Sequence, residues 1–225
     1  MCYDKETSLK TFTLAASVCL ILWFRNYPGD RVIAVMWPAV MAMQLAEYFM
    51  WDDQKCGLKN KYATVASGII LALQPIFIIS AVRFWGNSWL GNNSLDMLLG
   101  ILSISAAVFA YKCIEFSKKN NLCSRPGVLG HLEWDLDKLY ENTRGIAQTI
   151  IHGFYFIAFA FLITIKPSKL ALVYTAMCYA SLFYAIKITE GKESQWKSQW
   201  CWIANILTLI PLLTGYLNKR KIFPF

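Results

Sequence analysis

Long apolar runs alternate with short connections rich in Gly, Pro, Asn, Asp and Lys along the chain. A membrane-spanning helix needs roughly 20 mostly apolar residues. Seven runs have about this length: residues 9–24, 32–50, 62–85, 95–116, 145–165, 170–190 and 201–217. Backbone groups in a bilayer must be paired within the spanning element, and none of the runs shows the alternation of a barrel strand. The pattern predicts one all-α domain over residues 1–225, an integral membrane bundle of seven transmembrane helices.

The first run is short enough to be compared with a secretory signal peptide. The residues at its end, Trp23-Phe24-Arg25-Asn26, do not have the small side chains of a cleavage site. We therefore expect this run to stay in the protein as a helix.

Composition supports the membrane class. Apolar residues make up 56% of the 225 residues, charged residues make up 16%, and the mean hydropathy is +0.40. A typical soluble domain has roughly 25% charged residues, and a small one exposes much of its surface. These values exclude a disordered or collagen-like chain, and they exclude nucleic acid as a partner despite the net charge of +8. The expected partner is the lipid bilayer, and a homo-oligomer is left open.

Seven spans would place the two chain termini on opposite sides of the membrane. Lys and Arg are similarly dense at both ends of the bundle, so the distribution of charge does not fix the orientation. Four cysteines outside the middle of the spans, Cys2, Cys56, Cys123 and Cys201, all belong to the N-terminal end, as disulfides in an oxidising compartment would require. We expect a lumenal or extracellular N-terminus and a cytosolic C-terminus. The pair Cys56–Cys123 is favoured, because both residues lie in loops that can adjust.

Polar side chains within the runs gather toward the N-terminal end, where they predict a cup that opens to that side. Ionisable residues inside a membrane are costly, so each is a candidate functional residue. The candidate ligand-binding residues of the cup are Gln44, Glu47, Gln74, Arg144, Gln148, His152, Tyr184, Lys187 and Asn205.

Each of these residues also has a structural interpretation. Long basic side chains reach the headgroups, and amides hold helices together. His152 is better explained as a packing residue than as a metal ligand, and neither a metal nor a cofactor is expected. Glu47 is harder to explain in this way, because a buried carboxylate must be protonated or paired. We predict an ionised Glu47 paired with Arg144 or Lys187.

The connection between the fourth and fifth runs has one local pattern. Residues 131–137 alternate polar and apolar side chains, with the period of a strand. One face would carry His131, Glu133, Asp135 and Asp137, and a divalent cation on that face is the less favoured interpretation. The other face, Leu132, Trp134 and Leu136, is expected to lie on the helix ends as a lid.

Known seven-helix families differ from this chain at their defining residues. Retinal proteins need a lysine in the middle of the last span, and residues 201–217 contain none. Ceramidase-like hydrolases need several histidines for zinc, and this chain has two. Transporters of the PQ type carry Pro-Gln, whereas this chain has Gln74-Pro75. The strings MQLAEYFMW at 43–51 and WCWIAN at 200–205 resemble those of uncharacterised multi-pass proteins of large DNA viruses and their hosts. This resemblance implies no activity.

The sequence thus predicts a protein that binds a small ion or polar solute in the cup, with Glu47 as the charged anchor, and leaves translocation of that ligand open. The alternatives are an enzyme that acts on lipid headgroups, with Glu47 and His152 as its acid–base pair, and a structural membrane protein without a ligand.

Overall fold

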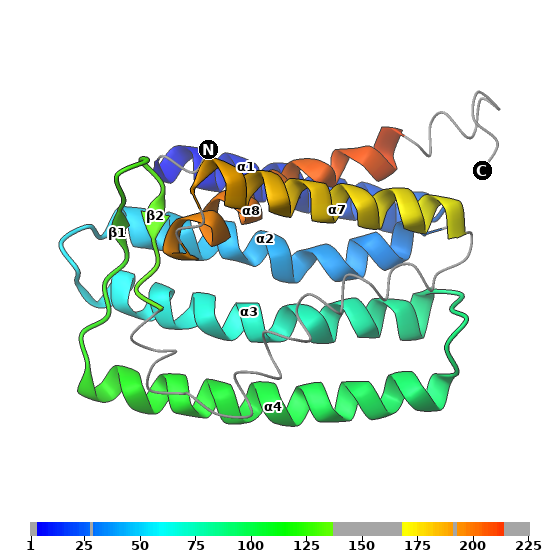
Figure 1. Ribbon diagram of the computed structural model, residues 1–225, viewed down its shortest axis with the longest axis horizontal. Helices are drawn as coiled ribbons and strands as arrows, with labels where there is room; N and C mark the ends of the chain where they lie inside the picture. The colour runs from blue at the N-terminus through cyan, green and yellow to red at the C-terminus, as the bar shows by residue number, and fades with distance from the viewer. Residues whose placement is uncertain (1–3, 28, 137–167, 191–192, 214–225) are drawn as a thin grey trace.

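The computed structural model describes residues 4–27, 29–136, 168–190 and 193–213 (Figure 1). In these ranges the helices are α1 (Lys5–Arg25), α2 (Asp30–Asp52), α3 (Leu58–Trp85), α4 (Asn92–Lys119), α7 (Ser168–Ile188) and α8 (Glu193–Leu207). Two short strands, β1 (Arg125–Pro126) and β2 (Leu132–Glu133), pair as an antiparallel hairpin. The all-α expectation is confirmed apart from this hairpin.

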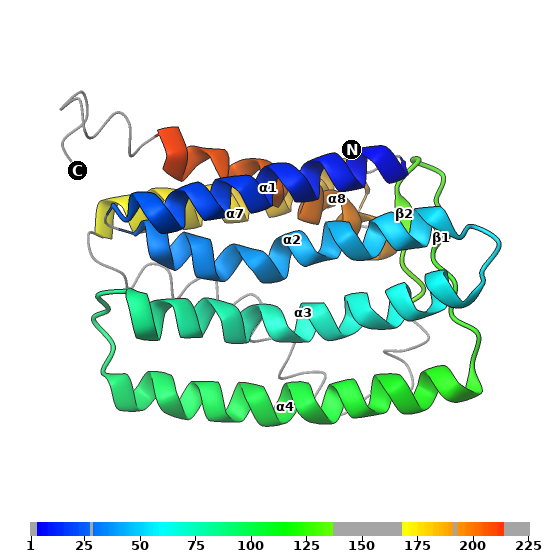
Figure 2. The ribbon, with the colours of Figure 1, turned by 180° about the vertical axis from the view of Figure 1, so that it is seen from behind.

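The long helices run along a common direction, with α2 between α1 and α3 and with α4 on the far side of α3 (Figures 1 and 2). Helix α7 packs on α8, and α8 also contacts α1 and α2. The hairpin lies at the end of the bundle that carries the beginning of α1, at the left of Figure 1. We call this end the N-terminal end. The opposite end carries the α1–α2 and α3–α4 connections.

Within the four described ranges, five helices are long and apolar enough to cross a membrane: α1, α2, α3, α4 and the part of α7 from Ala171 to Ile188. They match five of the predicted runs to within about four residues at each boundary. The fifth predicted run, 145–165, lies outside the described residues. The structure therefore supports a helical membrane protein with five membrane-length helices among the described residues, and it does not show the full set of seven spans that the sequence predicted.

The last predicted run differs most from the structure. We expected a span over 201–217, whereas α8 begins at Glu193 and ends at Leu207. A turn follows at Thr208, whose hydroxyl donates to the Asn205 carbonyl at 2.6 Å, before a helical segment at 209–213. Pro211 explains the interruption, because proline has no N–H to donate to the carbonyl four residues earlier and its ring clashes with that turn.

Candidate functional site

Glu47 lies inside the bundle near the N-terminal end. Helix α2 ends at Asp52, so Glu47 is five residues, or about 7.5 Å, from the end of the helix. Its side chain and that of Gln44 are completely buried. The two residues are three positions apart on one face of α2, and Gln44 Nε2 donates to Glu47 Oε2 at 3.0 Å. The spacing seen in the sequence thus produces a direct contact.

Two further donors reach the Glu47 carboxylate from distant parts of the chain. The Trp134 indole N–H donates to Oε1 at 3.1 Å, and the Ser198 hydroxyl donates to the same oxygen at 2.5 Å. Ser198 lies in the second turn of α8, and both donors are buried. Three donors from three segments match an ionised carboxylate, which only accepts hydrogen bonds.

Residues 121–136, which we call the cover, close the N-terminal end over this site. Within the cover, Leu132, Trp134 and Leu136 are each at most 2% exposed. The prediction that this apolar face lies on the helix ends as a lid is confirmed. The expectation that His131 lies on the solvated face is wrong, because His131 is only 3% exposed. Among the described cup residues, Gln44 and Glu47 are therefore covered at the N-terminal end.

Polar contacts attach the cover to α3. Asn60, at the start of α3, donates from Nδ2 to the Ser124 carbonyl at 2.9 Å and accepts from the Ser124 backbone N–H at 2.8 Å. The hydroxyl groups of Thr64 and Ser124 are 2.8 Å apart, and the backbone N–H of Asp135 also donates to the Ser124 hydroxyl. Asn60, Thr64 and Ser124 are fully buried. These bonds make the cover a docked part of the fold.

A disulfide joins Cys56 to Cys123, the pair that the sequence analysis favoured, with their Cα atoms 5.3 Å apart. It connects the α2–α3 loop to the beginning of the cover. Cys201 is a free, buried cysteine, so its proposed role in a disulfide is a wrong expectation. The early start of α8 places Cys201 two turns inside the helix instead of in a loop. Cys2 lies outside the described residues.

Two other predicted cup residues are buried but lie deeper in the bundle. Gln74 donates to the Ala39 carbonyl at 3.3 Å, and Asn205 donates to the Cys201 carbonyl of its own helix at 2.7 Å. Within the described ranges, no hydrogen-bond partner is present for Gln74 Oε1 or Asn205 Oδ1. Within the same ranges, three further buried groups have no partner: Trp37 Nε1 on α2, and Tyr174 OH and Thr175 Oγ1 on α7.

Two of the remaining predicted residues, both on α7, do not join this cluster. Tyr184 and Lys187 occupy exposed positions on α7. Since Glu47 is fully buried, the predicted pairing of Glu47 with Lys187 is wrong. Arg144, Gln148 and His152 lie outside the described residues, and so does the predicted pairing with Arg144.

Sequence reasoning missed Ser198 as a contact of Glu47, and it gave Trp134 a covering role without the hydrogen bond. Trp134 had a signal in the alternation of its segment, whereas Ser198 is an ordinary serine in a polar helix turn. Lys197, beside Ser198, is also buried. Among the residues that the structure describes, no group of three or more His, Cys, Asp or Glu side chains could hold a metal ion.

No protein-family model, curated protein or solved structure matches this chain. The fold and the site nevertheless define a class. In the part of the chain that the structure describes, this is a helical protein with five membrane-length apolar helices and a buried carboxylate under a disulfide-linked cover.

Proposed function

We propose that the chain is a multi-pass membrane protein that binds a small cation or polar solute at Glu47, beneath the cover, and passes it into the bundle. One observation carries this proposal. The Glu47 carboxylate is fully buried about 7.5 Å from a helix end, yet it is hydrogen-bonded by Gln44, Trp134 and Ser198. An ionisable group kept at such a depth in a membrane protein is a functional candidate.

The chemistry of Glu47 favours a cation or a ligand that donates hydrogen bonds. An ionised carboxylate has acceptor positions only, and Gln44 and Ser198 can both turn away by rotation about side-chain bonds. Their places can then be taken by a proton, a metal cation or the N–H and O–H groups of a solute. The indole N–H of Trp134 belongs to the cover, so opening the cover exposes the carboxylate from the N-terminal end.

Buried polar atoms continue from Glu47 toward the opposite end. Asn205 follows Ser198 by seven residues, about 10.5 Å along α8, and Trp37 precedes Glu47 by ten residues, about 15 Å along α2. Asn205 Oδ1, Tyr174 OH and Trp37 Nε1 have no hydrogen-bond partner within the described ranges. Buried polar atoms are usually satisfied by protein or water. A bound solute or its water would satisfy them, and this supports passage into the bundle.

Ion flux through liposomes tests the proposal. The purified protein, with its cysteines unchanged, should conduct protons or alkali cations after reconstitution. Glu47→Gln should abolish this flux, because glutamine keeps the size of the side chain but removes its charge. A hydrophobic carbodiimide should label Glu47, and the conducted ion should protect it from labelling.

Glu115→Gln provides the matched control. Glu115 is also a helical glutamate, but its side chain is 51% exposed and pairs with Lys119 one turn away at 3.6 Å. This variant should keep the flux of the unchanged protein. The proposal fails if Glu47→Gln keeps both its melting temperature and its flux, or if ions do not protect Glu47 from the carbodiimide.

A further inference from the structure

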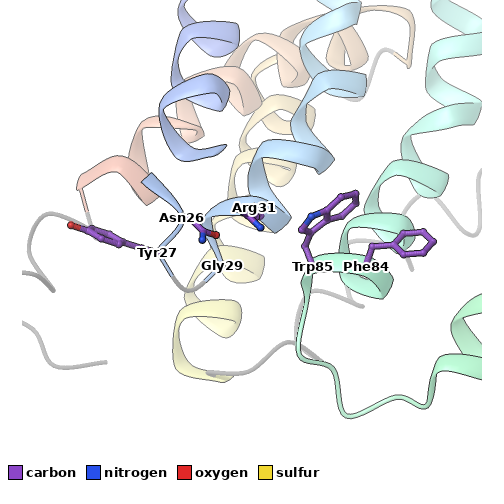
Figure 3. A pocket seen from close by; sticks show the side chains of 6 residues that line it. All are labelled: Asn26, Tyr27, Gly29, Arg31, Phe84 and Trp85. Atoms are coloured by element: carbon purple, nitrogen blue, oxygen red, sulfur yellow. The ribbon is translucent and has the colours of Figure 1, made fainter. Parts of the chain in front are cut away.

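A second candidate site lies at the opposite end of the bundle, away from Glu47. A pocket of about 440 Å³ opens between the α1–α2 connection, the first turn of α2 and the end of α3. In Figure 3, Asn26 and Arg31 lie between Tyr27 on one side and the aromatic pair of Phe84 and Trp85 on the other.

Arg31 supplies the charge of this pocket. Its guanidinium lies over the Trp23 ring, 5.2 Å from the ring centre, and its buried Nε has no hydrogen-bond acceptor in the part of the chain that the structure describes. A stacked guanidinium keeps the N–H groups at its edge available for a planar or tetrahedral oxyanion. A buried donor without an acceptor is costly, and a bound anion would remove that cost.

The other two arginines described at this end already have carboxylate partners. Arg25 makes two 2.7 Å bonds to Asp30, and Arg83 makes bonds of 2.7 and 3.2 Å to Asp96. The negative charge of Asp30, next to Arg31 in the sequence, is thus compensated by Arg25. Among the described residues, no carboxylate pairs with Arg31, so its charge remains available to a ligand.

The start of α2 adds backbone donors. Gly29, the N-cap, lines the pocket and brings no side chain to cap the helix. The Asp30 N–H already donates to the Tyr27 carbonyl at 2.9 Å, but the next N–H groups of a helix have no acceptor inside it, and the helix dipole favours an anion there. Gly29 has a φ of 86°, a backbone conformation that glycine adopts without strain. The turn therefore brings the helix start and Arg31 to the same pocket.

The surroundings of the pocket point to a lipid. Trp23, Trp85 and Trp89 are exposed near this end, as aromatic side chains are at membrane interfaces. The last two turns of α1, which lead into the α1–α2 connection at the pocket, expose Leu20 and Phe24, which gives acyl chains an apolar surface at this end of the bundle. A phosphate at the level of the tryptophans would thus have its chains in the apolar layer.

We propose that this pocket binds the phosphate of an anionic phospholipid, with Arg31 and the N-terminal amides of α2 as its donors and Trp85 on its rim. Inorganic phosphate shares the donor chemistry, but it does not use the apolar surface of α1. A basic residue near an anionic membrane surface contributes about 1 kcal/mol when no neighbouring carboxylate compensates its charge. We therefore expect Arg31 to raise the preference for an anionic lipid about fivefold, the ratio to which that energy corresponds.

Spin-labelled lipids in phosphatidylcholine vesicles test this proposal on the full chain. Labelled phosphatidylglycerol should be immobilised by the protein more strongly than labelled phosphatidylcholine. Arg31→Gln should reduce this preference about fivefold. Arg83→Gln is the matched control: Arg83 lies at the same end but outside the pocket, and its charge is already compensated by Asp96, so this variant should keep the preference.

Two further arms keep the result decisive. Trp85→Leu leaves the charge in place and opens the rim, so it should also weaken the preference. This variant replaces Arg31→Gln as the test if Arg31→Gln does not fold. Inorganic phosphate added in excess should not release the labelled lipid. The proposal is overturned if Arg31→Gln and Arg83→Gln have equal effects, if the unchanged protein shows no preference, or if free phosphate displaces the lipid.

Discussion

Trp134 lies far from Glu47 in the sequence, but its indole donates to the carboxylate in the folded protein. A hydrogen bond to a charged group contributes about 1.5–3 kcal/mol, and one between neutral groups contributes about 1 kcal/mol. At the scale of single residues, we therefore expect an ionised Glu47 to make the loss of the Trp134 N–H more destabilising than the loss of an N–H that donates to a neutral group.

Trp134→Phe removes this donor and keeps most of the apolar ring. We expect the free energy of unfolding in detergent to fall by about 1.5–3 kcal/mol. Trp200→Phe is the matched control, because the Trp200 indole donates at 3.1 Å to a neutral acceptor, the Ser181 hydroxyl. It should cost about 1 kcal/mol. Equal losses in chemical denaturation would contradict an ionised Glu47.

Among the elements, the cover combines tight docking with a titratable group. Burial lowers the pKa of His131 from 6.5 to about 4. An opened cover takes up a proton at the ordinary pKa, whereas the docked cover takes it up only near the lowered pKa. The docked state is therefore fully favoured above pH 6.5 and loses stability as the pH falls from there to about 4.

Hydrogen exchange of residues 121–136, corrected for the intrinsic pH dependence of exchange, measures this effect. Protection of the cover should decrease between pH 6.5 and about 4 in the unchanged protein. His131→Gln removes the titrating group, so the cover of that variant should exchange at a rate that does not depend on pH over this range. Equal pH dependence in both proteins would show that another group opens the cover.

The elements also show what the sequence can and cannot predict. Hydropathy located α1 to α4 and α7, because a membrane-length apolar run has few other folds available. It placed the start of α8 eight residues too late, because the polar residues Lys197, Ser198 and Gln199 near the start of α8 are buried by tertiary contacts that hydropathy does not record.

The candidate site was predictable only in part, for a related reason. Gln44 and Glu47 share one helix face, so helical spacing brings them together. Ser198 and Trp134 also contact Glu47, but they are separated from it by 151 and 87 positions in the chain. Such contacts depend on how α8 and the cover pack, and no local pattern specifies that. Lys187 was misplaced because its depth along α7 was known, but its direction around the helix was not.

At the scale of the whole molecule, Arg25 joins three segments at the end opposite the cover. It pairs with Asp30 of α2, and it donates to the carbonyls of Pro211 and Leu212 beyond α8, at 2.8 and 2.9 Å. The Asp30 side chain is 5% exposed. Arg25 thus ties the end of α1 to the start of α2 and to the segment that follows α8.

Arg25→Gln should therefore be strongly destabilising, by about 3–5 kcal/mol, because it leaves the buried Asp30 carboxylate without its partner. Arg83→Gln breaks an ion pair of similar length whose Asp96 side chain is 50% exposed, and it should cost less than about 1 kcal/mol. Thermal melting of the two variants in the same detergent measures the difference. Similar melting temperatures would contradict the stabilising role of Arg25.

The disulfide between Cys56 and Cys123 has a consequence for how the chain is inserted during synthesis. The two cysteines are 67 residues apart, and the chain between them includes all of α3 and α4. In a membrane, these cysteines meet only after α3 has crossed in one direction and α4 has returned. The presence of the disulfide therefore shows that α3 and α4 have both been inserted into the membrane. In a nascent chain, its formation should report the moment at which the first four helices have reached their topology.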